Sequence, residues 1–189
     1  MFGAHVRPAE TVESADWIAS SRLGDWGTLG ALVPNHYESY RLVEPAPAGV
    51  EDWWGAQREV IAAIASVGAR HTTTPDRVWF GIWEGHGFEN RGTEGPLATL
   101  SRFALPHRTY YLLSGHASAA TAIEEPGGSG RWRPPDLWWP DDRSWFVATD
   151  VDFWCNYVAG SVGFTSEVTA EVPTPARPVT LLHVLEPED

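Results

Sequence analysis

Apolar residues recur every three or four positions along one long stretch of the chain, residues 50–67. Glu51 and Asp52 fall in its first turn, where the helix dipole favours anions, and Gly68 follows its end. The pattern predicts an amphipathic helix with one face packed on a sheet. The apolar positions that carry it are Trp53, Val60, Ile61, Ile64 and Val67.

Shorter segments predict the remaining elements. Helical spacing over residues 11–22 and the alanines of residues 116–125 predict two further helices. Runs of aromatic and β-branched residues bounded by turn residues predict strands. These runs are residues 40–43, 78–83, 98–104, 109–113, 144–149 and 179–184. The proline-rich residues 171–178 predict a loop that crosses between elements.

Helices separated by strands, and then several strands in succession, favour an α+β fold over regular βαβ alternation. We expect a largely antiparallel sheet of about four to six strands packed against two or three helices. Because a chain of 189 residues has the length of one ordinary domain, residues 1–189 are expected to fold as one unit.

The charged residues limit the classes of function that are open to the chain. All 13 basic residues are arginines, so chemistry that needs a lysine amine is excluded. The net charge of −12 disfavours nucleic acid and favours a basic protein partner or a small polar ligand. A single cysteine, Cys155, the absence of a run of about 20 apolar residues and an N-terminus unlike a signal peptide suggest the cytoplasm and no membrane. We expect no cofactor, and the scattered histidines predict no metal site.

Tryptophan is concentrated between residues 131 and 157, which hold five of the eleven in the chain. The favoured interpretation is that these rings fill the core or its edge. The tryptophans concerned are Trp138, Trp139, Trp145 and Trp154. In the alternative, a turn at residues 140–143 presents Asp141, Asp142 and Arg143 beside exposed indole rings, as a platform for a sugar, a flat ligand or an arginine side chain. The burial of the rings decides between the two.

Two aspartates suggest a second class of function. Asp150 and Asp152 alternate, so both carboxylates point to the same face if the segment is a strand. Paired carboxylates can share a cation or carry out glycoside hydrolysis. Glu84 and His86, in a glycine-rich segment after a predicted strand, are the expected partners in such chemistry. The chain would then be a carboxylate-dependent hydrolase of glycosidase type.

Two segments resemble known families. Residues 135–161, PDLWWPDDRSWFVATDVDFWCNYVAGS, resemble the closing segment of a family of small bacterial hypothetical proteins, with its Trp-Trp-Pro, Asp-Arg, Ala-Thr and Gly-Ser elements. That resemblance implies no assigned activity. Residues 33–40, VPNHYESY, are similar to the Leu-Pro-x-x-Tyr opening of SUKH-type immunity proteins. The second resemblance implies an α+β domain that binds and neutralises a bacterial toxin, in many cases a basic nuclease.

The sequence therefore favours a non-enzymatic, immunity-like binding protein with an acidic, tryptophan-rich contact surface. The expected contact residues are Trp138, Trp139, Asp141, Asp142, Arg143, Asp150, Asp152, Glu84 and His86. The hydrolase is the alternative, and a stable domain without any ligand site is the third possibility.

Overall fold

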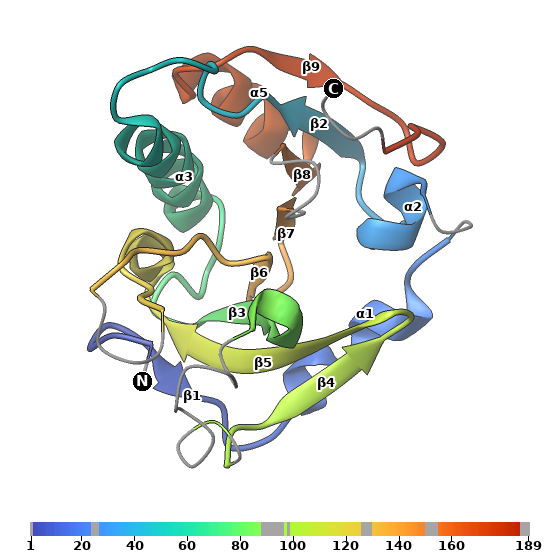
Figure 1. The fold of residues 1–189 in the computed structure, drawn as a ribbon. Coiled ribbons are helices and arrows are strands. Elements are labelled where there is room, and N and C mark those ends of the chain that lie inside the picture. The colour runs from blue at the N-terminus through green and yellow to red at the C-terminus, as the bar shows by residue number, and fades with distance from the viewer. Residues whose placement is uncertain are drawn as a thin grey trace.

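One antiparallel sheet runs through the computed structural model, which describes residues 2–23, 27–87, 97, 99–125, 130–149 and 155–185 (Figure 1). The strand order is β1-β5-β3-β6-β7-β8-β2-β9, and β4 also pairs with β5. The strands are β1 (Arg7–Pro8), β2 (Ser39–Val43), β3 (Val78–Trp83), β4 (Arg102–Leu105), β5 (Arg108–Gly115), β6 (Leu137–Pro140), β7 (Trp145–Thr149), β8 (Asn156–Gly160) and β9 (Ala176–Pro178). The α+β class and the antiparallel sheet are confirmed, but the sheet has nine strands instead of four to six.

The strands that the sequence did not predict have little pattern to detect. β1 has two residues and β9 has three, too few to show any alternation. β6 and β8 are buried at every position, so no polar residues alternate with the apolar ones. The sheet therefore extends further than its recognisable strands.

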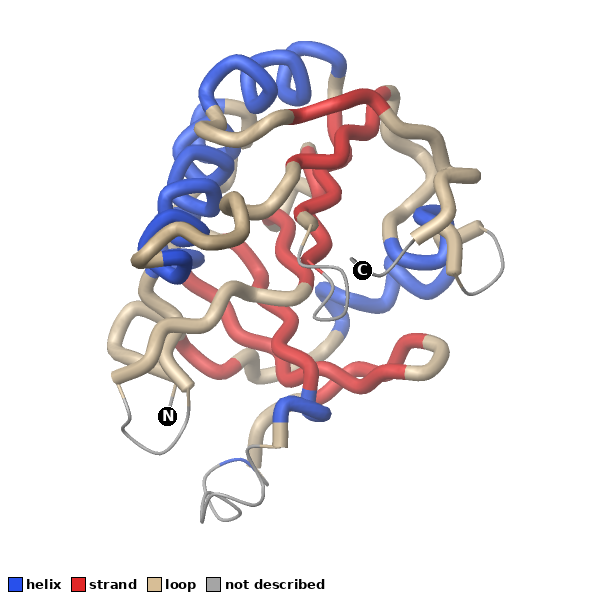
Figure 2. The backbone as a smooth tube through the Cα atoms, turned by 45° about the horizontal axis from the view of Figure 1, so that its top comes forward, coloured by secondary structure: helices blue, strands red, loops and turns tan. Residues whose placement is uncertain are grey.

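Helices cover both faces of the sheet. Four α-helices are described, against the two or three expected, but α1 and α2 have only five and four residues. The helices are α1 (Asp16–Ser20), α2 (Leu29–Leu32), α3 (Trp53–Arg70) and α5 (Val162–Glu171), with the 3-10 turns η1 (Glu13–Ala15), η2 (Glu84–His86) and η4 (Ala117–Thr121). Figure 2 shows α3 and α5 along one side of the strands. They form one core with Trp138, whereas α1 and α2 form a second core with Trp139.

The predicted long helix is confirmed as α3, with both ends three residues later than expected. It begins where the Asp52 side chain accepts a hydrogen bond from the Gly55 amide, 2.9 Å away. Gly68, expected after its end, lies inside it, and a Cβ there would come within 2.8 Å of the Trp145 ring. The Trp145 indole nitrogen donates to the Gly68 carbonyl at 2.8 Å. The absence of a side chain at Gly68 therefore lets the Trp145 ring pack directly on the backbone of α3.

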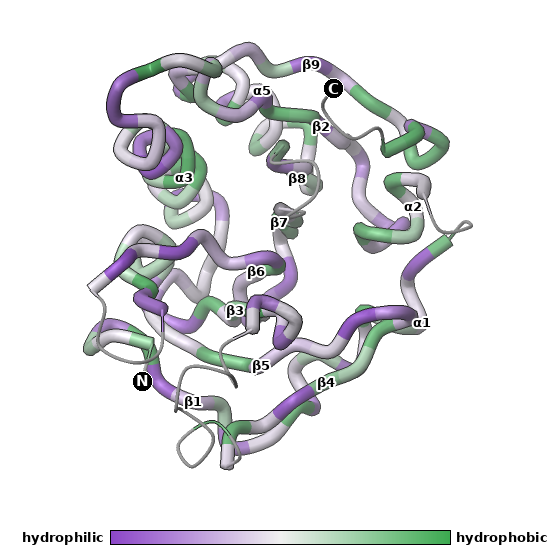
Figure 3. Tube along the Cα trace, viewed as in Figure 1, coloured by the Kyte–Doolittle hydropathy of each residue, from purple (hydrophilic) through white to green (hydrophobic). Residues whose placement is uncertain are grey.

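The prediction of a strand over residues 179–184 is wrong. The last strand of the described residues is β9, which lies within the proline-rich stretch that was expected to be a loop. The hydrophobic residues that follow β9 (Figure 3) lie along α2 instead, where the Leu29 amide donates to the His183 carbonyl. The helix expected over residues 116–125 is reduced to η4, and the one over residues 11–22 is divided between η1 and α1. No helix among the described residues is long and apolar enough to cross a membrane.

Candidate functional site

Trp138 and Trp139 are neighbours on β6, and their side chains enter opposite cores. Both are 0% exposed. The Trp138 ring packs edge-on against Trp145, with centroids 5.2 Å apart, and the Trp139 ring stacks on Phe146 at 5.7 Å. The core interpretation holds for all three tryptophans. The expectation that Trp138 and Trp139 contribute to a contact surface is corrected, because a sheet covered on both faces buries adjacent side chains alike.

In contrast, the charged turn that joins β6 to β7, residues 141–144, lies at the surface. Asp142 is exposed there, and hydrogen bonds fix its carboxylate. One Asp142 oxygen accepts from the amide and the hydroxyl of Thr73, each at 2.7 Å. The other accepts from the Ser144 amide at 3.1 Å. Burial alone raises the pKa of Asp142, but the hydrogen bonds from Thr73 and Ser144 together outweigh it and lower the pKa to about 2. The Asp142 carboxylate is therefore ionised and fixed.

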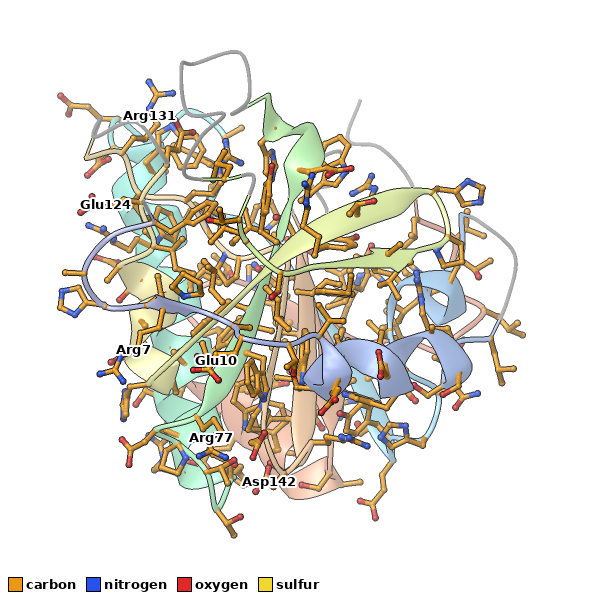
Figure 4. The ribbon with its side chains drawn as sticks, turned by 90° about the horizontal axis from the view of Figure 1, so that it is seen from below. Arg7, Glu10, Arg77, Glu124, Arg131 and Asp142 are labelled. Atoms are coloured by element: carbon orange, nitrogen blue, oxygen red, sulfur yellow. The ribbon has the colours of Figure 1, made fainter. Side chains whose placement is uncertain are left out.

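Asp141 fixes the same turn from the other side. The Trp79 indole nitrogen donates to its carboxylate at 2.9 Å, and the Arg77 guanidinium approaches it to 3.3 Å. The Asp141 amide also donates to the Arg77 carbonyl at 2.9 Å. Arg77 and Asp142 lie together at one end of the molecule in Figure 4. Both carboxylates of the turn are thus tied to the segment that precedes β3.

Arg143 adopts a backbone conformation that is unusual for a side-chain-bearing residue, with φ of 57°. The Tyr37 hydroxyl donates to its carbonyl oxygen at 3.0 Å. Its guanidinium lies over the Trp17 ring, 5.1 Å from the centroid. The Arg143 amide donates to the Pro140 carbonyl at 2.9 Å and closes the turn, and contacts from α1 and from the segment before β2 support its strained conformation.

Three aromatic rings adjoin Arg143. The rings of His36 and Tyr37 are 4.3 Å apart, and His36 meets the edge of Trp17 at 5.5 Å. Burial and the nearby charge of Arg143 lower the pKa of His36, so its ring is neutral at pH 7. Burial also raises the pKa of Tyr37, which keeps its hydroxyl proton. We call Trp17, His36, Tyr37 and Arg143, with the carboxylates of Asp141 and Asp142, the aromatic–arginine surface.

Glu84 and His86 lie elsewhere, at the end of β3. The Arg102 guanidinium approaches Glu84 to 3.4 Å. His86 lies within a buried network: the Arg133 guanidinium lies 3.0 Å from its Nδ1, and its Nε2 lies 3.0 Å from the Asp136 carboxylate. Asp136 also accepts from the backbone amide of residue 83 at 2.8 Å.

The His86 network continues through Arg133, which donates to Glu125 at 2.9 Å. The side chains of His86, Asp136 and Glu125 are only 4%, 7% and 3% exposed. Substrate cannot reach the His86 ring in this arrangement, and its hydrogen bonds join three separate segments of the chain. The network therefore holds η2, Glu125 and Arg133 next to the start of β6.

The structure does not bring the expected contact residues into one site. Asp141, Asp142 and Arg143 belong to the aromatic–arginine surface, whereas Glu84 and His86 lie at the His86 network. Asp150 and Asp152, like Trp154, lie outside the described residues. No three His, Cys, Asp or Glu side chains of the described ranges converge on a point that would suit a metal ion.

No protein-family model matches the chain. Neither a curated protein nor a solved structure matches it either. The function therefore has to be argued from the site alone.

Sequence reasoning missed the aromatic half of this surface. It assigned Trp17 to a helix, counted His36 among the scattered histidines, and gave residues 33–40 a role only through their resemblance to immunity proteins. The available signal was residues 35–37, Asn-His-Tyr, because they place two aromatic rings in a predicted turn segment, and loop segments often carry binding residues. Their meeting with Arg143, 106 residues from Tyr37, could not be inferred from spacing.

Proposed function

We propose that this chain is a binding protein whose aromatic–arginine surface docks a basic protein partner. The observation that carries the proposal is the strained backbone of Arg143, fixed by Tyr37 and Trp17 at an exposed turn. Strain of this kind destabilises the fold and persists where the surrounding structure enforces it, most often at functional positions.

The residue types support the same proposal. Tryptophan, tyrosine and arginine are the side chains that most often carry binding energy at protein interfaces. Here the Arg143 guanidinium is already stacked and its backbone already fixed, so less conformational entropy is lost on association. A surface prepared in this way can present a guanidinium and an exposed neutral imidazole to a partner.

The charge of the chain supports a basic partner. The net charge of −12 steers cationic proteins toward it, and the fixed carboxylates of Asp141 and Asp142 lie beside Arg143 as local contacts for cationic groups. The segment that resembles SUKH-type immunity proteins supplies His36 and Tyr37 to this surface. A toxin with a basic surface is therefore the partner class that we propose.

The test is affinity capture from the encoding organism and its culture medium, quantified by mass spectrometry. We expect the wild-type protein to retain a basic protein. The Arg143→Ala and His36→Ala variants should retain about one tenth of that amount or less. Arg131→Ala is the control, because Arg131 lies at the opposite end of the molecule from Asp142 (Figure 4). Retention should fall as salt rises, since exposed charges are screened.

Equal capture by wild type and Arg143→Ala would show that the partner uses another surface. If Arg131→Ala reduced capture as strongly as Arg143→Ala does, that result would also show that binding does not depend on the aromatic–arginine surface. Thermal unfolding of each variant separates lost binding from lost folding.

A further inference from the structure

A cavity of about 330 Å³ lies between α3 and η4, which pack against each other (Figure 1). A volume of this size is at the lower end of the range for small-molecule sites. Alanines of α3 line its apolar part, because their short side chains leave space between the two elements. The remaining lining is polar. The alanines are Ala62, Ala65 and Ala69, and the polar residues are Ser66, Arg70, His116, Ser118 and Thr121.

Ser118 and His116 form a hydrogen-bonded pair at this cavity. The Ser118 amide donates to Nδ1 of His116 at 3.1 Å, so this ring nitrogen is an acceptor and carries no proton. The Ser118 hydroxyl oxygen lies 2.8 Å from the same nitrogen and therefore donates its own proton to it. A hydroxyl held against an unprotonated imidazole nitrogen is the arrangement by which a general base activates a serine nucleophile.

The other side of the His116 ring faces a carboxylate. Asp76 Oδ1 lies 3.9 Å from Nε2, the nitrogen that carries the proton of the neutral ring. A carboxylate there favours the ring orientation in which Nδ1 faces Ser118, and it stabilises the positive charge that the ring acquires with the serine proton. Because the side chains of His116 and Asp76 are 49% and 92% exposed, water screens this interaction and its effect is small.

Capping of η4 explains the amide contact but not the hydroxyl contact. His116 directly precedes η4, and its side chain satisfies one backbone donor of the first turn when it accepts from the Ser118 amide. The Ser118 hydroxyl makes a second contact with the same nitrogen. The fold gains little from it, because an exposed hydroxyl bonds almost equally well to water.

We infer that Ser118 is the nucleophile of an esterase site that accepts small esters with a short apolar acyl group. The Ser118 oxygen attacks the ester carbonyl carbon, and its proton passes to Nδ1 of His116. The imidazolium gives that proton to the leaving alcohol oxygen as the C–O bond breaks, which leaves an acyl-serine. Water then attacks the acyl carbon, His116 takes a proton from the water and returns it to the Ser118 oxygen, and the carboxylic acid is released.

The lining of the cavity sets the class of ester. The alanines offer an apolar surface of the size of a short acyl chain. Ser66 accepts a hydrogen bond from the Arg70 guanidinium at 2.9 Å, so its own hydroxyl proton can be donated to the carbonyl oxygen of a bound ester. One hydroxyl stabilises an oxyanion less than a pair of backbone amides, so the site should cleave esters with a good leaving group, and slowly. The site shares no residue with the aromatic–arginine surface, and the inference does not rest on the proposed protein partner.

The experiment measures hydrolysis of p-nitrophenyl acetate by wild type and three variants. Ser118→Ala removes the nucleophile, and His116→Asn removes the base but keeps a residue that caps η4 well. Ser20→Ala is the control, because Ser20 is also an exposed serine and its hydroxyl donates to a backbone carbonyl. We expect kcat/KM to be at least about tenfold lower in Ser118→Ala and His116→Asn than in wild type, and unchanged in Ser20→Ala. Thermal unfolding shows whether each variant is folded.

A fluorophosphonate probe, which forms a stable covalent bond with activated serine oxygens, gives a second readout on the unmodified wild-type chain. Peptide mass spectrometry should find the adduct on Ser118 and not on Ser20. Hydrolysis that Ser118→Ala leaves unchanged would overturn the inference, because exposed histidines react with activated esters without a serine. A His116→Asn variant with wild-type activity, or a probe that leaves Ser118 unlabelled, would overturn it as well.

Discussion

Replacing Arg143 tests whether the turn is strained for the sake of its side chain. Arg143→Gly removes the left-handed strain, which costs a side-chain-bearing residue about 1 kcal/mol, and also removes the stack on Trp17. Arg143→Ala removes the stack but keeps the strain. Since an exposed cation–π contact contributes roughly 0.5–1 kcal/mol, Arg143→Ala should be less stable than wild type by that amount.

The free energy of unfolding of Arg143→Gly should therefore exceed that of Arg143→Ala by about 1 kcal/mol and lie close to the wild-type value. Urea unfolding followed by tryptophan fluorescence measures this difference, because the chain holds eleven tryptophans. A glycine variant less stable than the alanine variant would refute the claim of strain. An alanine variant as stable as wild type would refute the claim that the stack on Trp17 stabilises the turn.

Three further predictions concern the stability of the fold. Gly68→Ala should lower stability by about 1–2 kcal/mol in urea unfolding, because the clash with Trp145 outweighs the gain in helix propensity; a more stable variant would contradict that packing. The pKa of Asp142 is lowered to about 2 from 3.8, so its charge stabilises the fold above about pH 4 and this contribution, about 1 kcal/mol after solvent screening, is lost as the pH falls to about 2. Asp142→Asn should flatten the stability profile in that window alone. Asp136→Asn should destabilise by about 1–3 kcal/mol in thermal unfolding, because it weakens the hydrogen bonds that join Asp136 to His86 and to the amide of residue 83 in a buried network, and an unchanged stability would show that the network is not structural.

The local sequence pattern was sufficient to predict an element where that element is long or is bounded by clear turn residues. The 18 residues of α3 show helical spacing over five turns, and β3 has the limits that its aromatic and β-branched run predicted. In contrast, α5 could not be recognised, because only Phe164, Thr165 and Val168 of its ten residues are buried. Its start depends on Ser161, whose side chain accepts from the Phe164 amide at 3.1 Å.

The site was less predictable than the fold because burial, and not residue type, decides which tryptophan is available for contact. Trp138 and Trp139 stand beside the charged turn in sequence, yet β6 lies between two cores and buries both. Trp17, more than 120 residues away in sequence, is the indole that Arg143 covers. A sheet with helices on both faces removes the polar alternation from which side-chain direction is usually inferred.

The His86 network and Arg143 differ in what their polar groups do for the fold, and this difference makes the aromatic–arginine surface the better candidate for function. In the His86 network each charged group meets a partner, and the bonds join segments that would otherwise separate, so stability alone accounts for them. The Tyr37 hydroxyl bonds to the backbone carbonyl of Arg143, a contact that a glycine would also make, whereas the Arg143 guanidinium stacks on the Trp17 ring. Because that stack and the strain of the left-handed backbone roughly offset each other, the stability of the fold does not by itself require an arginine at this position. What the side chain adds is a fixed, exposed cation among aromatic rings.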